Sequence, residues 1–270
     1  MATSNPAVSM TEWPRAGGGE KTATVQGTAF KALILTAIMC VTGFHTWTLA
    51  TEGYAETFSQ HVKHKHPGDP TRIEIPDKVI GLAAVGVIGG FLAALACIFA
   101  PQASPVLAPI YAGLEGLALG AVSAGFEAKY PGIVPEAMVG VLTILVCMLA
   151  LYTTGILRPT EGFIAGVLAA MGGILAIYFA NIIFGFFGGK IGFVDGGGWA
   201  GIVFSGIVVV VASLNFIIDF GEIADNVERG APKYMEWYGA FGIMLTVVWL
   251  YLEMLRLLAK LKGDSDSSDD

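Results

Sequence analysis

The sequence is short of charged residues. They make up 14% of its 270 residues, whereas a soluble domain carries about 25%. Hydrophobic residues make up 54% of the chain, and its mean hydropathy is +0.68. A water-soluble domain of this length has no single core large enough to bury so much apolar surface. The composition therefore excludes an ordinary soluble enzyme and favours a protein surrounded by lipid.

Basic residues and cysteines are also scarce. The chain has 15 Lys and Arg against 22 Asp and Glu, a formal net charge of -7. This balance offers no basic face for a phosphate backbone and excludes nucleic acid as a partner. The three cysteines, Cys40, Cys97 and Cys147, lie in separate apolar runs, which excludes a disulfide framework and a paired-cysteine metal site. We expect each to be a small buried apolar residue.

Catalytic and metal-binding motifs are missing as well. The chain contains no GxSxG, HExxH or Walker sequence, and we therefore expect no enzyme activity and no cofactor. Three histidines, His61, His64 and His66, lie close together but alternate with Lys63 and Lys65. Lysines repel a metal cation, and no thiolate or carboxylate lies at matching spacing. We therefore expect a solvated charged loop here, and no metal site.

Long apolar runs dominate what is present. A helix needs about 20 apolar residues to cross the hydrocarbon core of a bilayer. Such runs recur at residues 30–50, 79–99, 106–125, 134–154, 163–187, 199–219 and 237–258. Most gaps between them are short, so neighbouring helices should pack antiparallel. The sequence predicts an all-α fold, a bundle of seven transmembrane helices.

The ends of the chain are polar. We expect a flexible polar arm at residues 1–29, a seven-helix membrane domain at 30–260 and an acidic disordered tail at 261–270. The glycine-rich gap 188–198 should be a turn without structure of its own. Small residues within the spans predict close contact between helices. These are the clusters Gly86 to Gly90, Gly113 to Gly120, and Gly172 with Gly173.

Ionisable residues inside the spans are the strongest functional signal. A carboxylate in the middle of a bilayer costs at least about 2.5 kcal/mol and often marks an ion or proton path. Glu115 lies near the middle of the third span, where it is either a neutral tie between helices or a member of such a path. Asp219 ends the sixth span. At about 100° per residue, Ser205, Asn215 and Asp219 fall within roughly 80° of one another, so we expect this polar stripe to face a cavity or pore.

The seventh span carries further acids. Glu253 and Arg256 are three residues apart near its end, so we expect a surface ion pair. Glu236 lies where the preceding loop enters this span. If that loop folds back towards Asp219, Glu236 could join it in an ion path.

Two segments are similar to the Bax inhibitor family, and most resemble its bacterial YccA-like branch. They are Pro109 to Gly120 and the carboxyl-terminal block from Asn215 to Leu258, which includes GAPKYMEWYGAFG. The resemblance extends over about residues 79–262. It implies a seven-helix bundle with a central carboxyl-terminal helix and a pH-dependent calcium leak.

The resemblance also implies a pair of acids that share a proton and sense pH. Asp219 matches the first acid, at the end of the sixth helix. The position of the second acid, counted back from Arg256, is Thr246, which cannot ionise. The basic residue that the family places on the second helix has no match between residues 79 and 99. By position, Glu115 or Glu236 could replace the second acid, and two carboxyls that met would not both ionise cheaply.

We therefore predict an integral membrane protein that provides a pH-sensitive leak for calcium or other cations, with Asp219, Glu115, Glu236 and Asn215 as pathway or pH-sensing residues. Its predicted location is a bacterial inner membrane. The alternative is an interaction protein, a modulator or substrate of a membrane-anchored AAA protease, since the resemblance implies such partners. For that function the relevant feature is the polar arm at residues 1–29, which a protease could grip.

Overall fold

Seven membrane-length helices make up most of the molecule. The computed structural model describes residues 21–64, 77–189, 191–196 and 198–266, except for the side chains of 54–64, 193, 195 and 264–266. Within these ranges, seven helices are long and apolar enough to span a bilayer, as the sequence predicts. They are α2 (Val25–His64), α3 (Asp77–Phe99), α4 (Ser104–Lys129), α5 (Ile133–Thr153), α6 (Glu161–Phe186), α8 (Trp199–Glu228) and α9 (Met235–Asp266). The short helices η1 (Pro101–Ala103) and α7 (Gly192–Asp195) lie in the connections.

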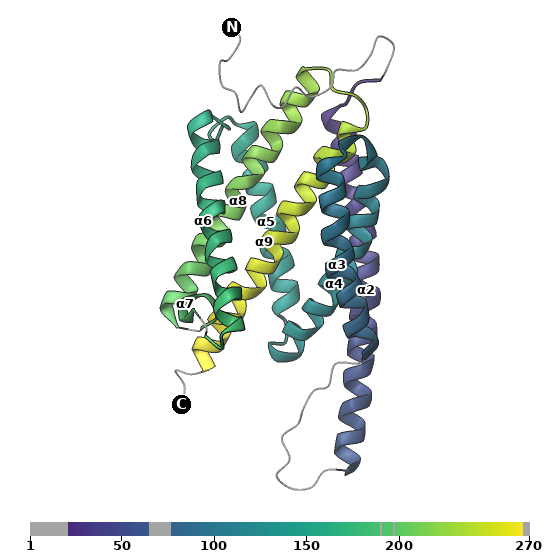
Figure 1. Ribbon diagram of the computed structural model, residues 1–270, viewed down its shortest axis with the longest axis vertical. Coiled ribbons are helices and arrows are strands. Elements are labelled where there is room, and N and C mark those ends of the chain that lie inside the picture. The colour runs from purple at the N-terminus through teal and green to yellow at the C-terminus, as the bar shows by residue number, and fades with distance from the viewer. Residues whose placement is uncertain (1–20, 65–76, 190, 197, 267–270) are drawn as a thin grey trace.

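The carboxyl-terminal helix α9 is the central element. It runs obliquely, with α2, α3 and α4 on one side and α6 and α8 on the other, while α5 crosses behind it (Figure 1). One core cluster joins α2, α3 and α4 to α9 and includes Leu35, Tyr111 and Phe241. A second joins α5 and α8 to α9 and includes Phe216 and Leu250. Because α9 contributes to both clusters, the predicted central position of this helix is confirmed.

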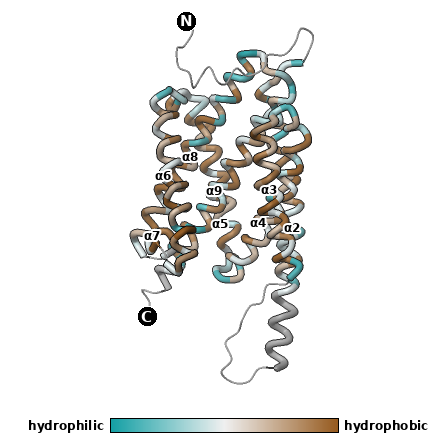
Figure 2. The backbone as a smooth tube through the Cα atoms, viewed as in Figure 1, coloured by the Kyte–Doolittle hydropathy of each residue, from teal (hydrophilic) through white to brown (hydrophobic). Residues whose placement is uncertain are grey.

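The outer surface of the bundle is apolar. Hydrophobic residues colour the middle of every long helix (Figure 2), and large side chains such as Phe179 and Phe186 of α6 are exposed. Such a surface suits lipid, because helices satisfy their backbone hydrogen bonds internally. The cysteines differ from our expectation: Cys97 is buried, but Cys40 and Cys147 are exposed. In a bilayer an apolar side chain can be stable on the lipid-facing surface as well as in the core.

Glycines bring α2 and α3 close to α4. A Cβ on Gly120 would lie 3.0 Å from the Cα of Gly43, and one on Gly86 would lie 2.6 Å from the carbonyl oxygen of Leu114. The close contacts predicted for these two glycine clusters are therefore confirmed. The prediction for Gly172 and Gly173 is wrong, since nothing lies within 4 Å of either position. These two glycines are on α6, which packs mainly against α8.

Several helices extend beyond the predicted spans. α2 continues to His64, α8 to Glu228 and α9 to Asp266, so residues 261–266 of the predicted tail are helical. Hydropathy marks only the part of a helix that lies at lipid depth, whereas the backbone pattern continues into water. At the end of α8, Arg229 donates to Asp225 at 2.8 Å, a pairing that favours the additional turns.

Two connections need separate comment. The gap 188–198 contains the single turn α7, so the prediction that it has no structure of its own is wrong. The buried side chain of Val194 provides an apolar anchor for this turn. The histidine side chains at positions 61, 64 and 66 lie outside the described residues, and so does most of the predicted arm, residues 1–20.

Candidate functional site at the interface of α8 and α9

A hydrogen-bonded chain of three polar side chains joins α8 to α9. The Asn215 amide donates to the Thr246 hydroxyl at 2.8 Å, and that hydroxyl donates to Asp219 Oδ2 at 2.6 Å. Asn215 also lies 3.5 Å from Asp219 Oδ1. Asn215 and Asp219 are one helical turn apart on α8, so both side chains face α9. The structure thus places two of the predicted site residues, Asp219 and Asn215, in one network.

Thr246 occupies the position where the resemblance implies a second acid. It is buried and its hydroxyl contacts the carboxyl of Asp219. The register between α8 and α9 therefore brings the two positions together, but the group that faces Asp219 is a hydroxyl. A hydroxyl can donate to a carboxylate and accept from an amide, as it does here, but it does not ionise near neutral pH. Where the resemblance implies two acids that share a proton, this chain has one acid, Asp219, and a hydroxyl donor, Thr246.

A second carboxyl lies near Asp219 on its own helix. The structure continues α8 to Glu228, so Asp219 lies within the helix and Glu222 follows it by three residues. Glu222 is exposed, and residues three apart on one helix are neighbours. The apolar run that predicts this span ends at Asp219, so Glu222 lay outside the predicted helix and was missed. Its spacing from Asp219 is the signal that could have identified it, because residues three apart share a helix face.

Further along α9, Glu253 forms a second polar layer. Its side chain is only 1% exposed. The carboxylate accepts hydrogen bonds from Arg256 Nη1 at 2.8 Å and from the Tyr178 hydroxyl at 2.9 Å. The Arg256 guanidinium lies over the Tyr178 ring, 5.2 Å from its centre. The predicted Glu253–Arg256 pair therefore exists, but the prediction that it lies at the surface is wrong for Glu253. α6 covers this acid, and periodicity along one helix does not show which neighbour will cover it.

Lys260 forms a third layer towards the end of α9. Its ammonium donates to the Ser205 hydroxyl at 2.9 Å and to the carbonyl oxygens of Val194 and Gly201 at 2.8 and 3.3 Å. Thr246, Glu253 and Lys260 are spaced by seven residues, about 10 Å of helix rise from one to the next. A polar line therefore follows the face of α9 that meets α6 and α8.

Apolar side chains close this line between the layers. Val208 and Val211 of α8, which lie between Ser205 and Asn215 in the chain, are both buried. They pack with Ile174 of α6 and with Trp249 of α9. The polar layers are thus separated by apolar side chains.

Glu236 belongs to a different network. It is fully buried and accepts from the backbone and the side chain of Thr24, each at 2.8 Å, and from Lys233 at 2.6 Å. Lys31 of α2 also pairs with it. Beside this cluster, Thr22 forms a β-bridge with Pro232. Glu236 therefore holds the start of α2 against the start of α9, and its partners do not include Asp219.

Glu115 lies at a third place, between α3 and α4. A Cβ on Gly90 of α3 would lie 2.8 Å from Glu115 Oε2, so the carboxyl occupies the space left by this glycine. In the part of the chain that the structure describes, Glu115 has no hydrogen-bond or ion-pair partner. The three predicted acids thus do not converge: Asp219 faces α9, Glu236 faces α2 and Glu115 faces α3. The described residues also contain no group of three or more His, Cys, Asp or Glu side chains that could hold a metal ion.

Comparison with known proteins gives one match. A family model described as Bax inhibitor 1 like matches residues 5–263, nearly the whole chain. No curated protein and no solved structure matches the chain.

Proposed function

The chain belongs to the Bax inhibitor 1 like family, and on this premise we propose that it is a passive, pH-sensitive leak pathway for cations, with calcium as the transported ion. The observation that carries the proposal is the position of Asp219, a carboxyl inside a membrane-spanning helix that faces a polar partner on the central helix. An acid inside a membrane-spanning helix is costly and commonly serves ion or proton movement. The proposed activity is passive and needs neither catalysis nor a cofactor.

The path would follow the polar face of α9. Glu222 and Asp219 would form its entrance, since one is exposed and the other lies one turn deeper. Glu253, held by Arg256 and Tyr178, would form a second polar layer. The buried side chains of Val208 and Val211 form the barrier along this path, and they must hydrate or move apart before an ion can pass.

Ionisation of Asp219 is the proposed trigger. The protonated carboxyl is neutral and does not attract a cation. The ionised carboxylate recruits water and cations, which stabilise the charge better than apolar neighbours do. It also meets the charge of Glu222, and like charges repel. We therefore expect hydration to separate α8 from α9, and the leak to increase as pH rises.

Calcium flux into liposomes tests the proposal. The purified protein is reconstituted with an internal calcium indicator, and the leak rate is measured between pH 6 and 8. We expect a leak that rises with pH in the unmodified protein and a low, flat leak in Asp219→Asn. Asp225→Asn is the matched control, because Asp225 is an exposed acid on the same helix and should leave the leak unchanged. Equal leaks from Asp219→Asn and the unmodified protein would overturn the role of Asp219.

The alternative function, as a modulator or substrate of a membrane-anchored AAA protease, rests on the amino-terminal arm. The structure limits the arm that a protease could grip, because Ala23 N donates to Ala231 O at 2.8 Å and α2 begins at Val25. A deletion of residues 1–20 therefore leaves the described contacts intact. Under this alternative, the deletion changes turnover by the protease and leaves calcium flux unchanged. The YccA-like branch and a bacterial inner-membrane location remain predictions.

A further inference from the structure

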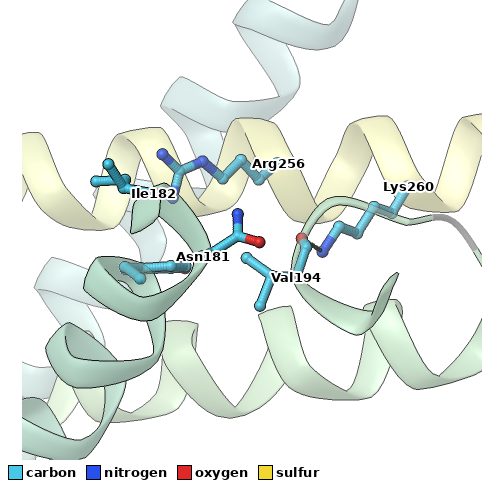
Figure 3. A pocket seen from close by; sticks show the side chains of 6 residues that line it. Asn181, Ile182, Val194, Arg256 and Lys260 are labelled. Atoms are coloured by element: carbon cyan, nitrogen blue, oxygen red, sulfur yellow. Dashed lines mark hydrogen bonds between the residues drawn. The ribbon is translucent and has the colours of Figure 1, made fainter. Parts of the chain in front are cut away.

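A cavity of about 250 Å³ opens between α6, α7 and α9. Its wall consists of Tyr178, Asn181 and Ile182 from α6, Val194 from α7, and Arg256 and Lys260 from α9. Arg256 and Lys260 approach it from α9 while Asn181 and Ile182 face them across the space (Figure 3). The cavity therefore combines two cationic side chains with an apolar wall.

The cavity lies near the ends of two membrane-length helices. Lys260 is six residues from the end of α9 at Asp266, and Ile182 is four residues from the end of α6 at Phe186. These spacings correspond to roughly 9 and 6 Å of helix rise. Nearby, Phe186, Phe187 and Trp199 are 86%, 86% and 78% exposed. Exposed aromatic side chains at helix ends are typical of the membrane interface.

The two cations are held in place by the fold. Three oxygens, from Ser205, Val194 and Gly201, accept hydrogen bonds from the Lys260 ammonium and fix it at the wall. Arg256 donates through Nη1 to Glu253 and lies over the Tyr178 ring, while its side chain is 47% exposed. A guanidinium has five N–H donors in a planar fork that matches the oxygens of a phosphate. The cavity thus offers an oxyanion the remaining N–H donors of Arg256 and the fixed positive charge of Lys260, whose own three donors are already used.

An apolar stripe leads from the middle of the membrane to this cavity. Leu175, Phe179 and Ile182 of α6 are 69%, 63% and 58% exposed. Their spacing of four and three residues places them on one face of the helix. Ile182 belongs to both the stripe and the cavity wall. A ligand that filled both would have a charged head and a hydrocarbon chain.

From this geometry we propose that the cavity binds the phosphate of an anionic phospholipid, whose acyl chain lies along Leu175, Phe179 and Ile182. Arg256 and Lys260 provide the charge, and α7 closes the headgroup site on the side of Val194. Basic pockets between transmembrane helices bind anionic headgroups in this way. The site shares Lys260 with the polar line of α9, and Arg256 pairs with Glu253 of that line. The proposal is tested by lipid binding, so its failure can be distinguished from failure of the cation leak.

Native mass spectrometry of the full chain tests this site. The protein is extracted from nanodiscs that contain equal amounts of phosphatidylglycerol and phosphatidylcholine, and the lipids retained on it are counted. We expect preferential retention of phosphatidylglycerol, with the preference reduced about fivefold by each of Arg256→Gln and Lys260→Gln. Lys262→Gln is the matched control: this lysine is on the same helix but pairs with Glu136, and its removal should leave the preference unchanged.

A steric variant separates binding from folding. Ile182→Trp fills the cavity without removing a charge, and its helix content and melting temperature are compared with those of the unmodified protein. We expect a folded protein that has lost the preference for phosphatidylglycerol. Equal retention of both lipids by the unmodified protein, or unchanged preference in folded Ile182→Trp, would overturn the proposal. In a last measurement, inorganic phosphate is added at 1 mM, roughly the dissociation constant of a weak anion site. Displacement of phosphatidylglycerol by phosphate alone would overturn the proposal and assign the cavity to the free anion.

Discussion

The hydroxyl of Thr246 donates a 2.6 Å hydrogen bond to Oδ2 of Asp219 across the interface of α8 and α9. Asn215 donates to the same hydroxyl at 2.8 Å and so fixes its orientation. Asp219 can therefore change its ionisation state while its partner on α9 stays neutral. We expect one proton to control this interface, and not a proton shared between two carboxyls.

Thr246→Asp tests that difference. The substitution places a second carboxyl next to Asp219, and two acids a few Å apart do not lose their protons together. We expect the pH dependence of calcium leak in liposomes to change from one step to two, separated by more than about one pH unit. Thr246→Val is the control, because it keeps the shape of the side chain and adds no ionisable group. A single step in Thr246→Asp at the pH of the unmodified protein would contradict the role of this contact.

The glycines of α4 and α6 provide a matched stability test. A Cβ on Gly120 would lie 3.0 Å from the Cα of Gly43, whereas nothing lies within 4 Å of Gly173. Gly120→Ala must push α2 away from α4, and we expect it to destabilise the protein by about 1–3 kcal/mol, the usual cost of overpacking. Gly173→Ala should be neutral or stabilise by up to about 1 kcal/mol, because alanine favours the helix. Thermal unfolding in one detergent compares the two, and an equal effect of both substitutions would contradict the packing.

Much of the fold could be predicted because its main signal is local. Runs of about 20 apolar residues identify membrane helices, and all seven lie where the sequence places them. The ends of the helices were predicted less accurately, because a helix such as α8 continues past its apolar run to Glu228. The glycine predictions were correct for α3 and α4 but not for Gly173. The sequence shows that a helix face carries small residues, but it does not show whether another helix packs against that face.

The candidate site divides in the same way. The polar stripe of Asn215 and Asp219 follows from periodicity along one helix. The sequence predicts that it faces a cavity or pore, and in the structure both side chains contact the Thr246 hydroxyl of α9. Glu253 was expected at the surface because its distance from the helix end is visible in the sequence, whereas its cover by Tyr178 is not. The partners of Glu236 include Thr24, 212 positions away in the chain. Pairings between such distant segments depend on how the helices assemble.

Glu236 leads to a prediction about the amino-terminal end of the domain. The carboxylate is fully buried and holds Thr24, Lys31 and Lys233 together. Removing one partner of a buried ion pair leaves the other charges without compensation, which commonly costs 3–5 kcal/mol. Because Lys233 is 47% exposed and can reach water, we expect Glu236→Ala to lower the free energy of unfolding by about 3 kcal/mol, the lower end of that range. Thermal unfolding in detergent measures the loss.

Hydrogen exchange then shows whether the loss arises at this contact. The backbone amides of Ala23 and Thr24 donate to Ala231 O and to Glu236 Oε1, so both should exchange faster in Glu236→Ala while the amides of α6 do not change. Asp225→Asn is the control, because Asp225 forms an exposed pair with Arg229 and such pairs contribute at most about 1 kcal/mol. Glu236→Gln keeps an acceptor for Thr24 but loses the ion pairs with Lys31 and Lys233. Its stability should therefore fall between that of Glu236→Ala and that of Asp225→Asn. If Glu236→Ala were as stable as Asp225→Asn, or if exchange at Ala23 and Thr24 were unchanged, the carboxylate would not be what ties α2 to α9.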